Sequence, residues 1–162
     1  MNKNLKEKLK AQLLQLVGKR CWGIVAGDGS GSIISLCIGD KIKRKKPIEN
    51  PTLTKDVQEY DSEYRLLLFC VWRLDSDKKI ICGAWDDNSQ GGKMLKGLNM
   101  LVGRKITQVN VCEPALDITI SFSGYVRLKV FCDQINEIDK YENYTLSTPM
   151  EVFVVGNRSR LR

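Results

Sequence analysis

The sequence predicts an α+β protein built from two degenerate repeats, each one helix followed by a four- to five-stranded antiparallel meander, packed as one pseudo-twofold unit. The first observation is a repeated segment, LVGKR at 16–20 and LVGRK at 101–105, which closes an apolar run of helical spacing in each copy. The second is a change to strand-like spacing after each glycine, in CWGIVAG and ITQVNVC. The third is that the following connections are too short for the crossover helices that parallel strands need.

The 162 residues are enough for one domain with a real core. We therefore expect a single domain over 1–162 that holds both repeats. Repeat 1 covers about 4–86 and contains an insertion at 43–62, and repeat 2 covers about 87–156. Residues 157–162 are expected to form a basic tail.

The first element of each repeat is predicted to be a helix that ends at a glycine, Gly18 or Gly103, because glycine favours the conformation that stops a helix. The apolar positions of the first helix are Leu5, Leu9, Leu13, Leu16 and Val17, and those of the second are Met94, Leu95, Leu98, Leu101 and Val102. The N-cap candidates of the second helix are Asp86, Asp87, Asn88 and Ser89.

The strands are clearest in repeat 2, where apolar and polar residues alternate on both sides of a Ser123–Gly124 turn. This alternation predicts a hairpin with one buried face. Its apolar positions are Leu116, Ile118, Ile120, Phe122, Val126, Leu128 and Val130. The closing strands of the repeats are expected to contain Ile80, Ile81, Val152, Val154 and Val155.

The two repeats align without a gap from residue 8 on residue 93, and then around an insertion of about thirteen residues in repeat 1. The matched pairs are Ile33 with Ile118, Gly39 with Gly124, Trp72 with Tyr144 and Leu74 with Leu146. The insertion, 43–62, contains Pro47 and Pro51 and few large apolar residues, so it is predicted to be a long loop. Long loops in compact domains are often functional, so a functional element is expected here first.

Cysteine and histidine usage argues against a metal site. The chain has six cysteines without a C-x-x-C pair and has no histidine, so a zinc site is not expected and neither is any cofactor. Most of the cysteines stand in apolar stretches and are predicted to be buried thiols.

The segment GDGSGS at 27–32 resembles a phosphate-binding loop, but it lacks the Lys-Ser/Thr ending and an immediately following helix. The corresponding segment of repeat 2 is CEPALD, without glycine, so a turn is the better interpretation.

Carboxylates are the remaining candidates for acid or base chemistry, because a Ser-His-Asp or Cys-His device needs histidine. The nearest clusters are Asp75 with Asp77 and Asp86 with Asp87, which are more typical of a strand turn and a helix cap. A small carboxylate- and metal-dependent enzyme is therefore only a third hypothesis, and no catalytic residue is assigned.

The formal net charge is +7, and the surplus lies at the front of the chain. Residues 1–46 hold eleven Lys or Arg against three acids. Such asymmetry favours nucleic acid, phosphate or an acidic protein as partner, while the alternative is a solvated helix face and a charged loop. The predicted partner-binding residues are Lys41, Lys43, Arg44, Lys45, Lys46, Arg158, Arg160 and Arg162. Of the tryptophans, Trp22 is the candidate for stacking on bases, whereas Trp72 and Trp85 are expected to pack.

The segments LVGRKITQV, SGYVRLKV, YENYTLSTP and VFVVG resemble a pattern in small bacterial proteins with duplicated β-rich halves, some of them immunity-like proteins of toxin systems. The resemblance covers mainly 98–156 and implies a non-catalytic protein that binds and blocks a partner. No site residue follows from it. Immunity proteins against basic nuclease toxins are usually acidic, so the partner of this basic chain would be acidic or held by other contacts.

The sequence therefore predicts a cytoplasmic, non-catalytic protein that binds another protein, as an immunity-type inhibitor or a subunit of a complex. A sequence-tolerant nucleic-acid-binding accessory protein, acting through the basic patches, is the alternative. The chain has neither a signal peptide nor an apolar run long enough for a bilayer, so no membrane partner is expected. Self-association into a homo-oligomer stays open.

Overall fold

The protein is described by a computed structural model that covers residues 3–135 and 141–162. It is an α+β protein, as predicted, with helices that are outnumbered by antiparallel strands. In chain order the elements are α1 (Lys3–Leu14), β1 (Cys21–Val25), β2 (Ile34–Lys43), α2 (Lys55–Glu59), β3 (Tyr60–Leu68), β4 (Val71–Ser76), β5 (Ile80–Gly83), α3 (Lys93–Asn99), β6 (Ile106–Cys112), β7 (Asp117–Phe122), β8 (Val126–Phe131), β9 (Glu142–Ser147), β10 (Val152–Gly156) and the 3₁₀ turn η1 (Asn157–Ser159).

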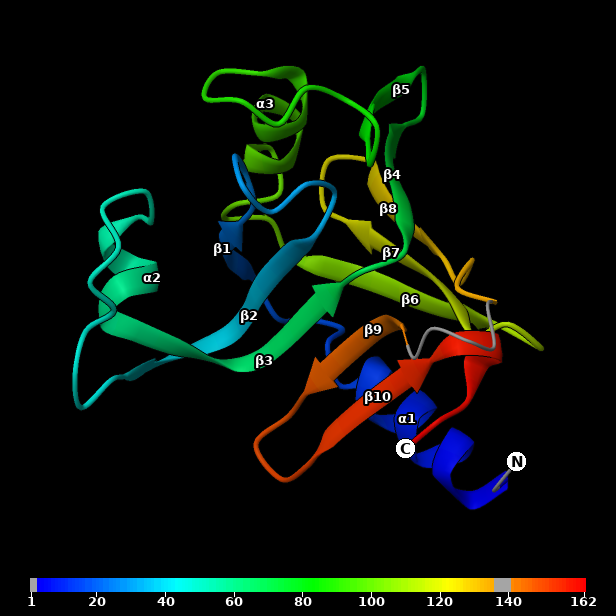
Figure 1. Cartoon of the computed structure of the whole chain (residues 1–162). Helices are drawn as coiled ribbons and strands as arrows, with labels where there is room; N and C mark the ends of the chain where they lie inside the picture. Colours follow the sequence, from blue (N-terminus) through cyan, green and yellow to red (C-terminus); the bar gives the residue numbers. More distant parts are fainter. Residues whose placement is uncertain (1–2, 136–140) are drawn as a thin grey trace.

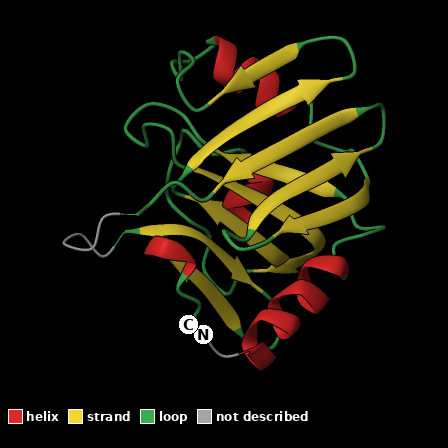
Figure 2. Ribbon diagram, turned by 90° about the vertical axis from the view of Figure 1, so that its right-hand side faces the viewer, coloured by secondary structure: helices red, strands yellow, loops and turns green. Residues whose placement is uncertain are grey.

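The strands form two five-stranded antiparallel sheets, β1-β2-β3-β9-β10 (sheet 1) and β5-β4-β8-β7-β6 (sheet 2). Figure 1 shows the course of the chain through both sheets, and in Figure 2 the sheets lie as two layers, one in front of the other. Alternate residues of the strands are buried, so each sheet presents one apolar face to a common core. The largest side chains that are fully buried include Trp72, Tyr144, Phe153, Leu9, Leu13, Leu16, Ile34, Leu36, Ile38, Leu66, Leu68 and Leu74.

Each sheet takes strands from both halves of the chain. Three consecutive strands of one half, β1-β2-β3 or β6-β7-β8, are completed by the last two strands of the other half, β9-β10 or β4-β5. The predicted meander is therefore interrupted after its third strand. Because each half contributes strands to both sheets, the exchange links the two layers through backbone hydrogen bonds.

The two LVG segments meet each other in the structure. Gly18 N–H donates to the Ile106 carbonyl (2.8 Å) and Gly103 N–H donates to the Cys21 carbonyl (2.7 Å). Arg20 and Lys105 form an antiparallel bridge between these bonds. Both glycines have the positive φ that was predicted, 89° and 84°. The α-helices themselves end earlier than predicted, at Leu14 and Asn99, because the backbone bonds tighten into turns that run on to the glycines.

Two aromatic side chains that align in the sequence make corresponding contacts. The Trp72 indole N–H donates to the Ser32 carbonyl (2.7 Å), and the Tyr144 hydroxyl donates to the Leu116 carbonyl (3.1 Å). Ser32 stands just before β2 and Leu116 just before β7. Each aromatic residue thus ties a strand to a loop of the same half, and each satisfies a polar atom in the core.

The hairpin β7–β8 confirms the predicted alternation, with Ile118, Ile120 and Phe122 buried opposite Val130, Leu128 and Val126. The predicted N-cap of the second helix is wrong. Gly92 occupies the cap without a side-chain hydrogen bond, and helix α3 starts later than expected. The predicted caps bind elsewhere: Asp86 accepts from Gly83 N–H, Asp87 accepts from the Ser89 hydroxyl, and the Asn88 amide donates to the Gly27 carbonyl.

The insertion 43–62 is not a loop throughout. It contains helix α2, capped by the Thr54 hydroxyl, and the first residues of β3. Val57 anchors α2 and is buried, and its side chain lies against Gly23 of β1. Val57 is the one buried residue of this five-residue helix. A segment with so few apolar residues resembles a loop in composition, which explains why the sequence predicted only a loop. We call residues 39–63 the β2–β3 arm; Figure 1 shows its projection from the sheets.

The basic tail 157–162 packs against sheet 1. After η1, the chain pairs with β10: Val154 N–H donates to the Arg162 carbonyl (2.9 Å), and Arg162 N–H donates to the Val154 carbonyl (3.1 Å). Leu161 bridges Val155. The last residues therefore cover part of the outer edge of sheet 1, which would otherwise expose unpaired backbone groups.

Candidate partner-binding surfaces

The first two cations of the β2–β3 arm are held by the protein itself. The Lys41 ammonium lies 5.3 Å from the centre of the Trp22 ring and 5.7 Å from that of Tyr60, and it pairs with Asp56 at 2.7 Å. Lys43 lies over Tyr60 at 6.0 Å. These rings are occupied by cations of the same chain, a favourable contact of about 0.5–1 kcal/mol each at exposed sites. Trp22 is therefore not an open stacking platform for bases.

Arg44 is the least exposed of the predicted cations. Its guanidinium pairs with Asp61 at 3.4 Å, and Arg65 approaches the same carboxylate at 2.6 Å. Burial acts to raise the pKa of Asp61, but the Ser62 N–H and the two guanidinium groups outweigh it and hold the pKa below its usual value. Asp61 is thus a carboxylate committed to two internal cations.

The charge of the arm is balanced by its own acids. Residues 39–63 contain six Lys or Arg and six Asp or Glu, so the net charge is zero. Lys46 lies 4.0 Å from Glu49, and both side chains are exposed. Lys45 is exposed as well. The run KIKRKK therefore produces a weaker positive field than its sequence suggests.

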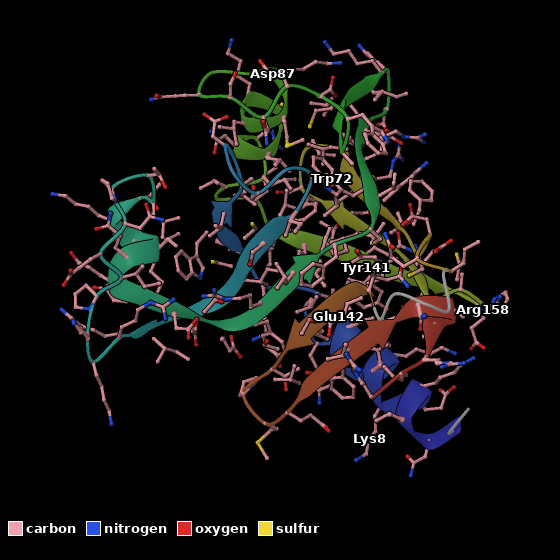
Figure 3. The ribbon with its side chains drawn as sticks, in the orientation of Figure 1. Lys8, Trp72, Asp87, Tyr141, Glu142 and Arg158 are labelled. Atoms are coloured by element: carbon pink, nitrogen blue, oxygen red, sulfur yellow. The ribbon has the colours of Figure 1, made fainter. Side chains whose placement is uncertain are left out.

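The C-terminal arginines lie on the other side of the molecule. Figure 3 labels Arg158 at the right, whereas the arm projects to the left. The Arg158 guanidinium donates to the Ile135 carbonyl at 3.2 Å, and Arg162 pairs with Glu142 at 2.7 Å. Arg160 is exposed. The structure therefore does not bring the two predicted basic patches together.

The carboxylates considered for chemistry are engaged in structural contacts. Asp75 is nearly buried and pairs with Arg73 at 2.8 Å and Lys129 at 3.3 Å. Burial acts to raise its pKa, but the two cations outweigh it and lower the pKa below the usual value. Asp77 pairs with Arg127 at 2.9 Å. Within the part of the chain that the structure describes, no three His, Cys, Asp or Glu side chains are grouped to hold a metal ion.

The glycine-rich segment 27–32 connects β1 and β2, as the turn interpretation requires. The Asn88 side-chain amide donates to the carbonyls of Gly27 (3.1 Å) and Gly31 (3.0 Å). The Ser30 hydroxyl also donates to the Gly27 carbonyl, at 2.7 Å. These contacts fix the loop through its own carbonyl groups, so it is explained as a structural connection.

The sequence interpretation missed the most exposed aromatic residue of the described chain. Trp85 was expected to pack, yet its side chain is 88% exposed. It follows β5 in a tight turn closed by the Asp86 N–H, which donates to the Gly83 carbonyl at 3.1 Å. This turn reverses the chain immediately after buried Ala84 and points the next side chain outward.

Asp86 holds this turn rigidly. Its carboxylate accepts a hydrogen bond from Gly83 N–H (2.8 Å) and pairs with Lys93 of α3 at 3.0 Å. The ion pair with Lys93 lowers the pKa of Asp86 below its usual value, so the carboxylate is charged at neutral pH. Trp85 is therefore presented by a fixed backbone rather than by a free loop.

The elements that flank Trp85 in the chain, β5 and α3, carry exposed apolar and basic side chains. Lys93, the partner of Asp86, also lines a shallow groove between β5 and α3 together with Ile81, Lys96, Gly97 and Met100. Ile80 at the start of β5 is 59% exposed. We call this the Trp85 surface, defined by Ile80, Ile81, Trp85, Lys93, Lys96 and Met100. The loop from β5 to α3, which also carries Asp87, lies at the top of Figure 3. An exposed aromatic with adjacent apolar and basic groups is typical of a protein interface.

Comparison with known proteins gives no further lead to the function. Neither protein-family models, nor curated proteins, nor solved structures contain a match to the chain. Every helix among the described residues is too short or too polar to cross a membrane.

Proposed function

We propose that the protein acts without catalysis by binding another protein, as an immunity-type inhibitor or a subunit of a complex, and that the contact is centred on Trp85. The observation that carries this proposal is the 88% exposure of Trp85 on a turn that Asp86 fixes by hydrogen bonds and an ion pair. Tryptophan is enriched among the residues that dominate binding energy, and a rigid anchor loses little entropy on binding.

The charge of the Trp85 surface indicates an acidic partner. Lys93 and Lys96 of this surface lie on α3, and Lys78 and Lys79 stand outside it, just before Ile80 of β5; all four are exposed. Asp86 compensates only Lys93. An acidic partner would therefore be attracted to the edge of the surface, while Trp85 and the neighbouring isoleucines supply the apolar contact.

The nucleic-acid alternative has weaker support. Its predicted cations on the arm are compensated by an equal number of acids, and Lys41 and Lys43 cover the aromatic rings that bases would need. The enzyme hypothesis is weaker still, because Asp75, Asp77 and Asp86 each pair with a cation.

The test uses the full chain as bait in extracts of the source cells. Three baits are compared: the wild type, Trp85→Ala, and a triple variant with Lys43, Lys45 and Lys46 changed to Gln. Arg44 is left intact because its ion pair with Asp61 is internal. Each capture is run with and without nuclease and analysed by mass spectrometry. We expect the wild type and the triple variant to retain one acidic protein after nuclease treatment, and Trp85→Ala to bind it at least about 30-fold more weakly.

The outcomes separate the hypotheses. Capture that disappears with nuclease and in the triple variant would support the nucleic-acid alternative. Full retention by Trp85→Ala would exclude the Trp85 surface. Because Trp85 is so exposed, its replacement should change the free energy of unfolding by less than about 0.5 kcal/mol, so lost binding would not reflect lost folding. An inhibitor role further predicts that the captured protein loses an activity in the complex.

We also propose that the two halves are diverged copies of one unit. The reciprocal bonds of Gly18 and Gly103, the corresponding contacts of Trp72 and Tyr144, and the exchanged strands all support a pseudo-twofold relation. Under this proposal, features shared by both halves serve the fold. Features of one half alone, such as the β2–β3 arm and the exposed Trp85, are the better candidates for function.

A further inference from the structure

Cys70 and Cys132 lie opposite each other where two paired strands of sheet 2 end. Strands β4 and β8 are antiparallel with Val71 opposite Phe131, so the next residues in register are Cys70 and Cys132. The backbone N–H group of each cysteine is held by a hydrogen bond. Cys70 N–H donates to the Asn143 carbonyl (3.1 Å), and Cys132 N–H donates to the Asp117 carboxylate (2.7 Å).

The two side chains share the core-facing side of the sheet. Trp72 and Val130, two residues further along, are opposite each other and buried, and alternation places Cys70 and Cys132 on the same face. The Cys70 thiol lies close enough to the Cys132 thiol to raise its pKa. Opposed residues of antiparallel strands have Cα atoms about 4.5–5.5 Å apart, within the range that a disulfide spans.

We propose that Cys70 and Cys132 are a disulfide-forming pair that closes when the protein meets a disulfide oxidant such as oxidised glutathione. Cys132 is partly exposed and Cys70 is buried, so Cys132 reacts first. Its thiolate attacks one sulfur of glutathione disulfide and releases one glutathione thiolate. Cys70 then loses its proton, attacks the Cys132 sulfur and displaces the second glutathione. Two protein thiols are oxidised and one glutathione disulfide is reduced to two thiols.

The surroundings of the pair make this reaction slow. The contact with Cys70 and burial raise the pKa of the Cys132 thiol, and the nearby Asp117 carboxylate acts in the same direction. Tyr144 also lies close and is held neutral by burial. The thiolate that must attack is therefore scarce at neutral pH, which distinguishes the pair from a fast peroxide sensor. The proposal is independent of the partner-binding function.

The test oxidises the folded full chain in a Cys112→Ser background, because Cys112 is exposed and would otherwise react alone. The protein is incubated with glutathione disulfide at about pH 8.5, where more thiolate forms, and is then alkylated and mapped by mass spectrometry. Before alkylation, we expect an intact mass lower than that of the reduced chain by two hydrogens. After alkylation and digestion, we expect one cross-linked peptide pair that joins Cys70 to Cys132. Dithiothreitol should reverse both changes.

Two variants distinguish the mechanism from nonspecific oxidation. Cys70→Ser should stop at a stable glutathione adduct on Cys132, and Cys132→Ser should leave Cys70 reduced. The oxidised chain should melt higher by on the order of 5–10 °C, because the bond closes a loop of about sixty residues in the unfolded state. A Cys112→Ser product that keeps glutathione on Cys132, or that retains both thiols after prolonged oxidation while remaining folded, would overturn the proposal.

Discussion

Replacing Tyr144 by Phe tests the contact that ties β9 to the loop before β7. Tyr144 is fully buried, and its hydroxyl donates to the Leu116 carbonyl at 3.1 Å. Burial raises the pKa of Tyr144 well above its usual value, so the hydroxyl is a neutral donor at pH 7. Phenylalanine fills almost the same space, and the loss is therefore confined to one hydrogen bond and one buried carbonyl without a partner.

The expected cost follows from these two terms. They measure the same loss and do not add: a net hydrogen bond contributes about 0.5–1.5 kcal/mol, and a buried polar group left unpaired costs about 1–3 kcal/mol. We therefore expect Tyr144→Phe to lower the free energy of unfolding by about 1–2 kcal/mol, around the overlap of the two ranges. For a chain of this size the melting temperature should fall by roughly 3–6 °C. Urea unfolding at pH 7, followed by tryptophan fluorescence, measures the difference directly.

Tyr125→Phe is the matched control. Tyr125 is 77% exposed, so removal of its hydroxyl should change the free energy of unfolding by less than about 0.5 kcal/mol. If both variants cost the same, or if Tyr144→Phe costs less than about 0.5 kcal/mol, the Leu116 contact does not stabilise the fold and the reasoning fails.

Two further substitutions probe the packing and the electrostatics of sheet 2. Gly97→Ala would place a Cβ 2.4 Å from the Cys82 sulfur, so we expect a loss of about 1–3 kcal/mol in urea unfolding; an unchanged midpoint would contradict the close approach of α3 to β5. Asp75→Asn removes the charge that binds Arg73 and Lys129, at a cost of about 1–3 kcal/mol at pH 7. Because the pKa of Asp75 is lower in the folded state, its contribution is fully present above the unfolded pKa of about 4 and disappears as pH falls through the folded pKa. The difference between Asp75→Asn and the wild type should therefore shrink as pH falls below about 4, and a difference that stays constant on acidification would contradict this role of Asp75.

Local patterns in the sequence predicted several elements correctly. The positive φ of Gly18 and Gly103 and the β7–β8 hairpin follow from spacing and from the conformational freedom of glycine. The match of Trp72 with Tyr144 also holds in the structure, where both donate to a carbonyl just before a strand. These features depend on residues close in the chain or on repeated spacing, which a single sequence displays.

Other features depend on partners that are distant in the chain. The sequence does not show that β4 pairs with β8 in sheet 2 instead of continuing the sheet of β1, β2 and β3. Strands with similar apolar patterns are equally suitable pairing partners when only the local sequence is considered. The acids that compensate the basic run come from α2 and β3, beyond a long connection. Trp85 follows an apolar strand and so resembles a core residue, and only the turn at Asp86 shows that it faces outward. The sequence feature that could have predicted the exposure of Trp85 is the pair of aspartates that follows it, because aspartate is typical of turns.

The exchange of strands between the two sheets has a consequence for synthesis on the ribosome. Strand β3 pairs with β9, with Leu66 opposite Leu146, so its second neighbour is made some eighty residues later. At about 5–20 residues per second, the nascent chain waits roughly 4–16 s before this edge can be paired. Throughout that interval the first half carries apolar strands without their cover, and the growing polypeptide must stay clear of its neighbours on the polysome until the second half arrives.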